Sequence, residues 1–278
     1  MTFRSLSPRL AAVMALCVGL AGAPIAASAQ AFVEFPGRSL YERFGVDAVD
    51  LFDLRGQLSR STLIDVRPRL EYDILHIEGA HHVPLSAPDF EDQVRALEAE
   101  HGGPLVFYCN GRTSYMSYRA AARANSAGLG PTQAYDAGVK DWAERYPGLA
   151  MLRGERIEDP ESQLIDDAVF EARLLDADTF ARRVRNDDGA VVIDVRGNEE
   201  RDEISLFAGR EISAPLQDIT RLNRVLGQAR RDGVPLLIFD QNGRQVRWLQ
   251  YHLEEGGIDD YRFLEGGLQR FYDEVMTR

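Results

Sequence analysis

The sequence predicts an α/β protein of two tandem domains, each an open, mainly parallel sheet with helices on both faces. Three observations lead to this fold class. The chain matches itself at a period of about 130 residues, helical and strand-like segments alternate within each copy, and apolar strands end at polar loops. A length of 278 residues is enough for two ordinary domains.

Two pairs of segments carry the repeat. "STLIDVRPRLEY" (61–72) recurs as "AVVIDVRGNEER" (190–201), and each aliphatic run ending in Asp-Val-Arg is typical of a buried parallel strand. "GGPLVFYCNG" (102–111) recurs as "GVPLLIFDQNG" (233–243), which indicates a second buried strand that runs into a polar loop. Each copy therefore contains two buried strands of the predicted sheet.

Helical segments separate these strands. We expect helices over residues 46–58, 89–100, 115–127 and 246–255. The last two end at Gly128 and at Gly256-Gly257, as helix C-termini commonly do. A closing match pairs "YDAGVKDW" (135–142) with "YRFLEGGLQRF" (261–271).

The first 29 residues have the pattern of a secretory signal peptide. Arg4 and Arg9 precede an apolar stretch, and Ala27-Ser28-Ala29 supplies a cleavage site before Gln30. An uncleaved membrane anchor is the alternative, but the stretch is rich in Ala and Gly and only weakly hydrophobic. We therefore expect a periplasmic or secreted protein with no stable membrane insertion after cleavage.

Domain boundaries follow from the repeat and from composition. We expect a first domain over residues 30–150 and a second over 171–278. Residues 151–170, with Pro, Gly and many charges, are expected to form the linker. The net charge is −12, and removal of the leader's two arginines leaves 44 acidic against 30 basic residues, or about −14. Since no basic run interrupts this balance, nucleic acid is excluded as a partner.

One cysteine, Cys109, remains after the leader. It is either a small buried core residue or a reactive thiol. Cys109 ends an apolar strand directly before a helix, the position at which open α/β sheets bind ligands. Backbone N–H groups at such a helix N-terminus stabilise an anion and favour the thiolate. We therefore predict Cys109 as the catalytic residue, with a substrate-binding loop of Asn110, Gly111, Arg112, Thr113 and Ser114.

Three separated motifs resemble the rhodanese family. They are "IDVRPRLEYDILHIEGAHHVPL" (64–85), "VFYCNGRTS" (106–114) and "YDAGVKDW", and the resemblance extends over the chain after residue 45. It implies two rhodanese-like domains and a sulfurtransferase that forms a persulfide on Cys109. The implied partners are a small sulfur-containing anion or a thiol or persulfide as donor, and a thiophilic acceptor such as cyanide, a thiol or a protein thiol. The family needs no metal and no organic cofactor.

Two departures from the family pattern leave alternatives open. Cys109 lies 19 positions before Gly128, whereas its equivalent Asp240 lies 16 before Gly256. Longer loops mark related phosphatases and arsenate reductases, but those enzymes need an arginine six residues after the cysteine, where Tyr115 stands. Asp240 cannot carry sulfane sulfur, so we expect the second domain to be inactive. A non-enzymatic persulfide carrier or protein-binding module is the remaining alternative.

Overall fold

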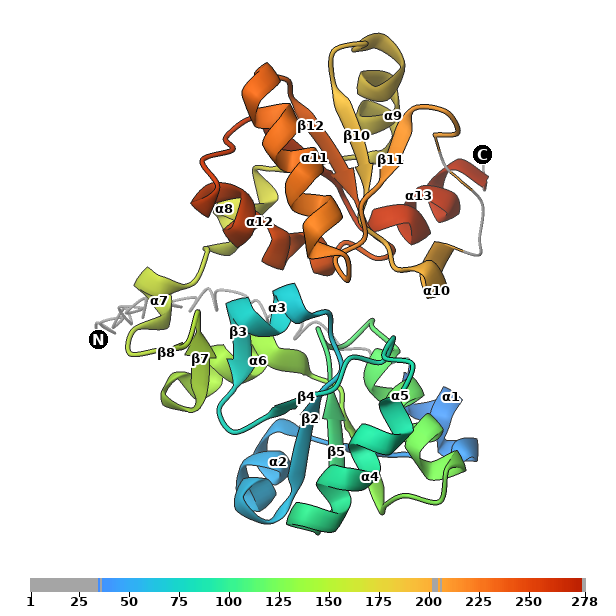
Figure 1. Cartoon of the computed structure of the whole chain (residues 1–278), viewed down its shortest axis with the longest axis vertical. Helices are drawn as coiled ribbons and strands as arrows, with labels where there is room; N and C mark the ends of the chain where they lie inside the picture. Colours follow the sequence, from blue (N-terminus) through green and yellow to red (C-terminus); the bar gives the residue numbers. More distant parts are fainter. Residues whose placement is uncertain (1–34, 36, 202–204, 206, 277–278) are drawn as a thin grey trace, which may run out of the picture. The chain divides into compact units, whose positions relative to one another are not determined.

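The computed structural model describes residues 35, 37–201, 205 and 207–276, and it contains two five-stranded parallel sheets (Figure 1). The first sheet has the strand order β1 (Asp47–Val49), β6 (Thr132–Tyr135), β5 (Leu105–Tyr108), β2 (Thr62–Asp65), β4 (His81–His82). The second has the order β11 (Glu211–Ser213), β10 (Val191–Asp194), β12 (Leu236–Phe239), β13 (Tyr261–Leu264), β9 (Leu174–Leu175). We call each sheet with its helices the first half and the second half.

The two sheets have the same topology. In each, the strand that ends in Asp-Val-Arg lies beside the strand that precedes the polar loop: β2 pairs with β5, and β10 pairs with β12. Every pairing within the two sheets is parallel. The predicted fold class, tandem parallel sheets in an α/β protein, is confirmed.

Helices surround both sheets. Those of the first half are α1 (Gly37–Tyr41), α2 (Leu51–Gln57), α3 (Arg69–Ile74), α4 (Phe90–His101), α5 (Met116–Ser126) and α6 (Gly138–Arg145). Those of the second half are α9 (Ala177–Asn186), α10 (Asn198–Arg201), α11 (Ile219–Asp232), α12 (Gln245–Glu255) and α13 (Gly267–Met276). Short 3-10 helices cover Glu42–Phe44, Leu58–Arg60 and Pro147–Leu149.

The predicted helices at 89–100, 115–127 and 246–255 agree with α4, α5 and α12 to within one residue at each end. The helix expected over residues 46–58 is wrong in its first part, because residues 47–49 form the edge strand β1. Asp50 sets the boundary, since its side chain accepts hydrogen bonds from the N–H groups of Phe52 and Asp53 and so caps α2.

The stretch expected to be a linker contains regular structure. β7 (Ala150–Leu152) and β8 (Glu155–Arg156) join β3 (Leu75–Ile77) in an antiparallel three-stranded sheet, and α7 (Pro160–Gln163) and α8 (Asp167–Glu171) follow. Ile157 in this stretch is buried. Residues 150–157 therefore pack against the first half, whereas Ile165 and Phe170 contact Tyr251 and Phe263 of the second.

The predicted signal peptide, residues 1–29, lies outside the described residues. Among the residues that are described, no helix has the length and apolar character needed to cross a membrane.

Buried residues lie on both faces of the first sheet. Tyr108 and Val106 of β5 belong to a core that also contains Trp142 and continues to Trp248 in the second half. Phe107 and Cys109, which alternate with them, belong to a core on the opposite face, against α5. The β-strand period thus directs the Cys109 side chain toward α5.

Candidate active site

Cys109 lies at the carboxyl end of β5. Its backbone carbonyl accepts a hydrogen bond from the N–H of Val139 in α6 (3.2 Å), which fixes the end of the strand. Its thiol is fully buried, and its Sγ donates a long contact to the carbonyl oxygen of Ser114 (3.9 Å). The thiol is therefore shielded from solvent within its own loop, the Cys109 loop (109–116).

Gly111 gives the Cys109 loop its sharp course. Its φ of +104° belongs to the region that favours glycine, and a Cβ there would lie 2.2 Å from the carbonyl oxygen of Ala137. Gly138 is equally restricted, because its Cβ would lie 2.4 Å from the Cα of Gly111. The loop and the start of α6 thus approach each other as backbone against backbone. The Ser114 N–H then donates to the Gly111 carbonyl (2.7 Å) and closes the turn before α5.

The predicted substrate-binding side chains separate into two groups. Arg112 and Thr113 point outward: Arg112 Nε donates to Asp141 Oδ2 (3.1 Å), and Thr113 is exposed. Asn110 and Ser114 are buried. The Asn110 side chain makes three hydrogen bonds to other side chains, which gives it a role in holding the loop.

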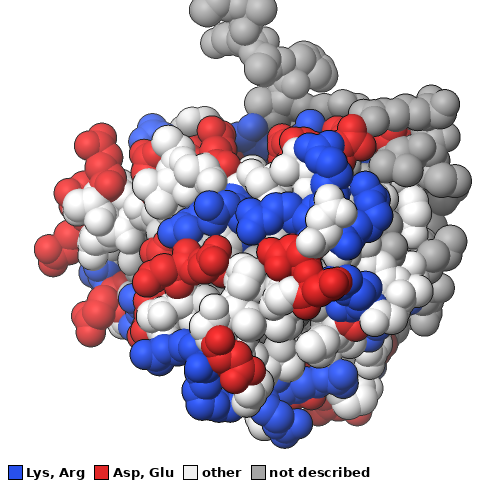
Figure 2. Space-filling model, turned by 90° about the horizontal axis from the view of Figure 1, so that it is seen from above, with Lys and Arg blue, Asp and Glu red and all other residues white. Residues whose placement is uncertain are grey.

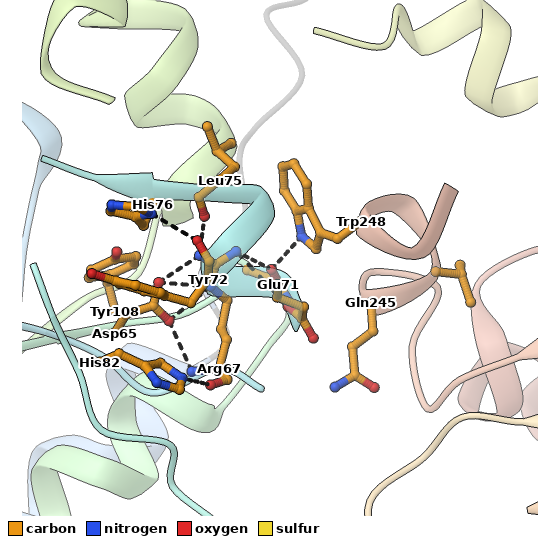
Figure 3. Close-up of polar contacts among 12 residues, drawn as sticks. Asp65, Arg67, Glu71, Tyr72, Leu75, His76, His82, Tyr108, Gln245 and Trp248 are labelled. Atoms are coloured by element: carbon orange, nitrogen blue, oxygen red, sulfur yellow. Dashed lines mark hydrogen bonds and ion pairs between the residues drawn. The ribbon is translucent and has the colours of Figure 1, made fainter. Parts of the chain in front are cut away.

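Asn110 joins the two halves of the protein. Its Nδ2 donates to Glu71 Oε2 (2.5 Å), and its Oδ1 accepts from Arg67 Nη1 (3.3 Å). Trp248, in α12 of the second half, donates from Nε1 to the same Oδ1 (2.6 Å). Figure 3 shows Trp248 projecting from α12 toward Glu71 and Arg67. The residue after the cysteine is therefore held in part by the second half.

A buried ion pair lies beneath this contact. Arg67 and Asp65 are both fully buried, and Arg67 Nη2 lies 2.6 Å from Asp65 Oδ2 (Figure 3). The second half repeats the arrangement, with Arg196 Nη2 at 2.9 Å from Asp194 Oδ2. Because the pair recurs in the half without a cysteine, the repeated Asp-Val-Arg motif supports the fold.

The network also contains the buried carboxyl group of Glu71, whose pKa is shifted. Burial raises its pKa to about 8, although Arg67 and the Asn110 side chain act in the opposite direction. Its Oε1 has no hydrogen-bond partner among the described residues. At neutral pH, Glu71 is thus mainly a neutral acid.

Glu71→Gln is expected to flatten the pH dependence of stability. The folded pKa of about 8 lies above the ordinary value of 4.5, so the folded state holds a proton that the unfolded chain has lost. The wild-type free energy of unfolding should therefore fall as pH rises from 4.5 to about 8, by an amount on the order of a few kcal/mol. Glutamine does not titrate and still accepts from Asn110.

Urea denaturation at several pH values between 5 and 9 measures this effect. Glu200, whose pKa burial raises to about 7, contributes a fall of the same sign in both proteins, so the difference between them isolates Glu71. A variant that loses stability with pH as steeply as the wild type would contradict the assignment.

The twin of the Cys109 loop, the Asp240 loop (240–246), surrounds a carboxylate with backbone donors. Asp240 Oδ1 accepts from the N–H of Gly243 (2.6 Å), and Oδ2 accepts from Gln245 (2.7 Å) and Val246 (3.2 Å). Asp240 is fully buried, and burial raises its pKa while these N–H groups lower it. In the second half, three backbone N–H groups thus form an anion-binding site that the Asp240 carboxylate itself occupies.

Two of the cavities that adjoin the Cys109 loop are lined by residues 110–116 and by the second half. One, of about 320 Å³, has residues 113–116 on one side and Glu200, Gln241 and Asn242 of the second half on the other. The second cavity, of about 520 Å³, is lined by Asn110 and Arg112 together with Arg244 and Trp248. Both halves therefore contribute to the surroundings of the loop.

Sequence reasoning missed three residues of the site. Glu71 stood in the quoted motif, but nothing in the motif indicated that its carboxyl would be buried against Asn110. Trp248 had no signal of its own. For Arg244 the signal was present, because Asn110-Gly111-Arg112 recurs as Asn242-Gly243-Arg244.

Part of the chain is similar to a known family of domains. The family model "Rhodanese-like domain" matches residues 40–145, the segment that contains Cys109 and its loop. The match indicates a rhodanese-like domain in this part of the chain.

Among curated proteins, a thiosulfate:glutathione sulfurtransferase of Saccharomyces cerevisiae is 33% identical over 89 residues, which are 29% of this chain and 63% of the relative. An HTH-type transcriptional regulator of Mycobacterium tuberculosis is 32% identical over 110 residues, 39% of this chain and 46% of the relative. The chain thus spans less than two thirds of these relatives.

Among solved structures, a thiosulfate sulfurtransferase from Pseudomonas aeruginosa is similar with a TM-score of 0.36 and 20% identity. The match covers 83% of this chain and 43% of that chain.

Proposed function

We propose that the protein is a sulfurtransferase that carries sulfane sulfur on Cys109 and acts in the periplasm or outside the cell. The observation that supports this most directly is the Asp240 loop. At the equivalent place in the same topology, it directs three N–H groups at an anion. The Cys109 loop also connects a parallel strand to a helix, so it is suited to hold a thiolate or persulfide in the same way.

The proposed step transfers one sulfur atom. The Cys109 thiolate attacks the outer sulfur of thiosulfate and forms an S–S bond, while the original S–S bond breaks and its electron pair leaves with sulfite. Cys109 then holds a persulfide anion, from which cyanide or a thiol takes the outer sulfur and restores the thiolate. This is covalent catalysis in which the enzyme stores the transferred group.

Loop movement is part of this proposal. In the structure a carbonyl oxygen, that of Ser114, faces Cys109 Sγ, which suits a donating S–H group. A thiolate or persulfide anion is repelled by a carbonyl oxygen and needs N–H donors instead. Loading of Cys109 therefore requires the peptide groups of residues 113–116 to turn.

The donor that we propose follows the name of one relative. The Saccharomyces cerevisiae relative is named for thiosulfate and glutathione, so we propose thiosulfate as the donor and a low-molecular-weight thiol as the acceptor. The surface shown in Figure 2 has basic side chains beside acidic ones, a mixture that suits a small ligand better than nucleic acid.

A second candidate function is persulfide carriage without turnover. The observation that favours it is the complete burial of Cys109, which restricts access of a second substrate. A carrier accepts one sulfur and releases it only to a partner protein that opens the loop.

Intact-mass measurement after incubation with thiosulfate tests the proposal. We expect a gain of one sulfur atom that cyanide removes, followed by repeated formation of thiocyanate. Loading without turnover would favour the carrier. If neither thiosulfate nor a persulfide adds sulfur to the protein, the proposed function is wrong.

A further inference from the structure

An arginine of the second half reaches the Cys109 loop. Arg244 Nε donates to Thr113 Oγ1 at 3.2 Å, although the two residues are 131 positions apart. Arg244 belongs to the Asn-Gly-Arg sequence of the Asp240 loop, and Arg112 belongs to that of the Cys109 loop. The two matching loops thus bring one arginine each to the same place.

Ion pairing distinguishes Arg244 from the other cations around it. The cavity of about 520 Å³ beside the Cys109 loop is lined by five basic and five acidic side chains. Four of the basic side chains have a carboxylate partner: Arg112 with Asp141, Lys140 with Glu144, Arg247 with Asp167, and Arg270 with Glu265. Within the described part of the chain, Arg244 forms no ion pair.

The charge of Arg244 is also poorly compensated. Arg244 is an exposed residue, yet partial desolvation by the protein lowers the pKa of its guanidinium, and repulsion from Arg112 lowers it further, with Asp141 acting in the opposite direction. An anion between Arg112 and Arg244 would relieve this repulsion. In a chain of net charge −12, such a point of uncompensated positive charge attracts small anions.

We propose that Arg244 and Arg112 form an anion subsite beside the Cys109 loop, so that the second half selects anionic sulfur donors. The subsite rests on the proposed function of Cys109. It binds the sulfonate end of a thiosulfate-like donor. Thr113 orients Arg244, and Asp141 orients Arg112. The half without a cysteine thereby takes part in donor binding.

Steady-state kinetics of Arg244→Gln with thiosulfate tests the subsite. We expect KM for thiosulfate to rise about tenfold with little change in kcat, because a charge-assisted contact to the donor is lost. The wild-type KM should also rise more steeply with ionic strength than that of the variant. Arg270→Gln is the matched control: it removes a charge from the same cavity, but one paired with Glu265 and Glu274, and should leave KM within about twofold.

Alkylation of Cys109 tests the subsite without sulfur transfer. Iodoacetate and iodoacetamide react with a thiolate in the same way, by displacing iodide, but only iodoacetate is an anion. The ratio of their rates at Cys109, followed by peptide mass spectrometry, should fall about fivefold in Arg244→Gln and stay unchanged in Arg270→Gln.

The outcomes separate the two proposals. An unchanged rate ratio and an unchanged KM for thiosulfate in Arg244→Gln would overturn the subsite, even if Cys109 is loaded with sulfur. A wild-type protein that gains no sulfur would contradict the proposed function, while a lower ratio in the variant would still support an anion subsite.

Discussion

Cys109→Ser is expected to abolish sulfur loading and thiocyanate formation, with a loss of more than about a hundredfold that is limited by the background reaction. A serine hydroxyl is a poor nucleophile toward sulfane sulfur and cannot store it as a persulfide. Intact-mass spectrometry after thiosulfate treatment gives the loaded fraction, and colorimetric detection of thiocyanate gives turnover.

Two controls show whether the loss is chemical. The serine oxygen is too far from the Ser114 carbonyl to accept the role of the thiol, whose Sγ lies at 3.9 Å, so the buried hydroxyl should lower the free energy of unfolding by about 1–3 kcal/mol and leave the variant folded. Cys17→Ser, in the predicted leader, should load as the wild type does. If Cys109→Ser still gains one sulfur and Cys17→Ser does not, Cys109 is not the carrier.

The strands and the place of the cysteine could be predicted because they depend on local pattern. An aliphatic run of four to six residues that ends in Asp-Val-Arg indicates a buried strand wherever it stands, and its recurrence in positions 61–72 and 190–201 indicates the same topology twice. β5 and β12 are likewise both aliphatic runs that end at a polar loop, so Cys109 and Asp240 were predicted at equivalent strand ends.

The contacts between the halves could not be predicted in this way. Trp248 Nε1 and Asn110 Oδ1 belong to residues 138 positions apart, and they meet only when both sheets have formed. The hydrophobic pattern of each segment predicts its own secondary structure but not a contact with a distant segment. The burial of Cys109 was not predicted either. The polar residues of its loop suggest exposure, but in the structure the turn closed by Ser114 lies over the thiol.

Asp240→Ala is expected to lower the free energy of unfolding by about 4 kcal/mol. The variant leaves the N–H groups of Gly243, Gln245 and Val246 without the carboxylate that accepts from them, in a buried place. Urea denaturation measures the loss. Asp188→Ala removes a carboxylate that is 94% exposed in the same half, and should change stability by less than about 1 kcal/mol.

Addition of formate tests whether the backbone N–H groups of the Asp240 loop bind an anion without the Asp240 side chain. A formate ion has the size of the deleted carboxylate and can accept the same three N–H groups, so it should restore part of the stability of Asp240→Ala, whereas chloride at equal ionic strength should restore less. The wild type should not respond, since its own side chain fills the place. Equal responses of both proteins would mean that the backbone donors do not bind an anion by themselves. Binding of formate would mean that a loop of this topology holds a small anion through its backbone alone, which is the property that a persulfide on Cys109 requires.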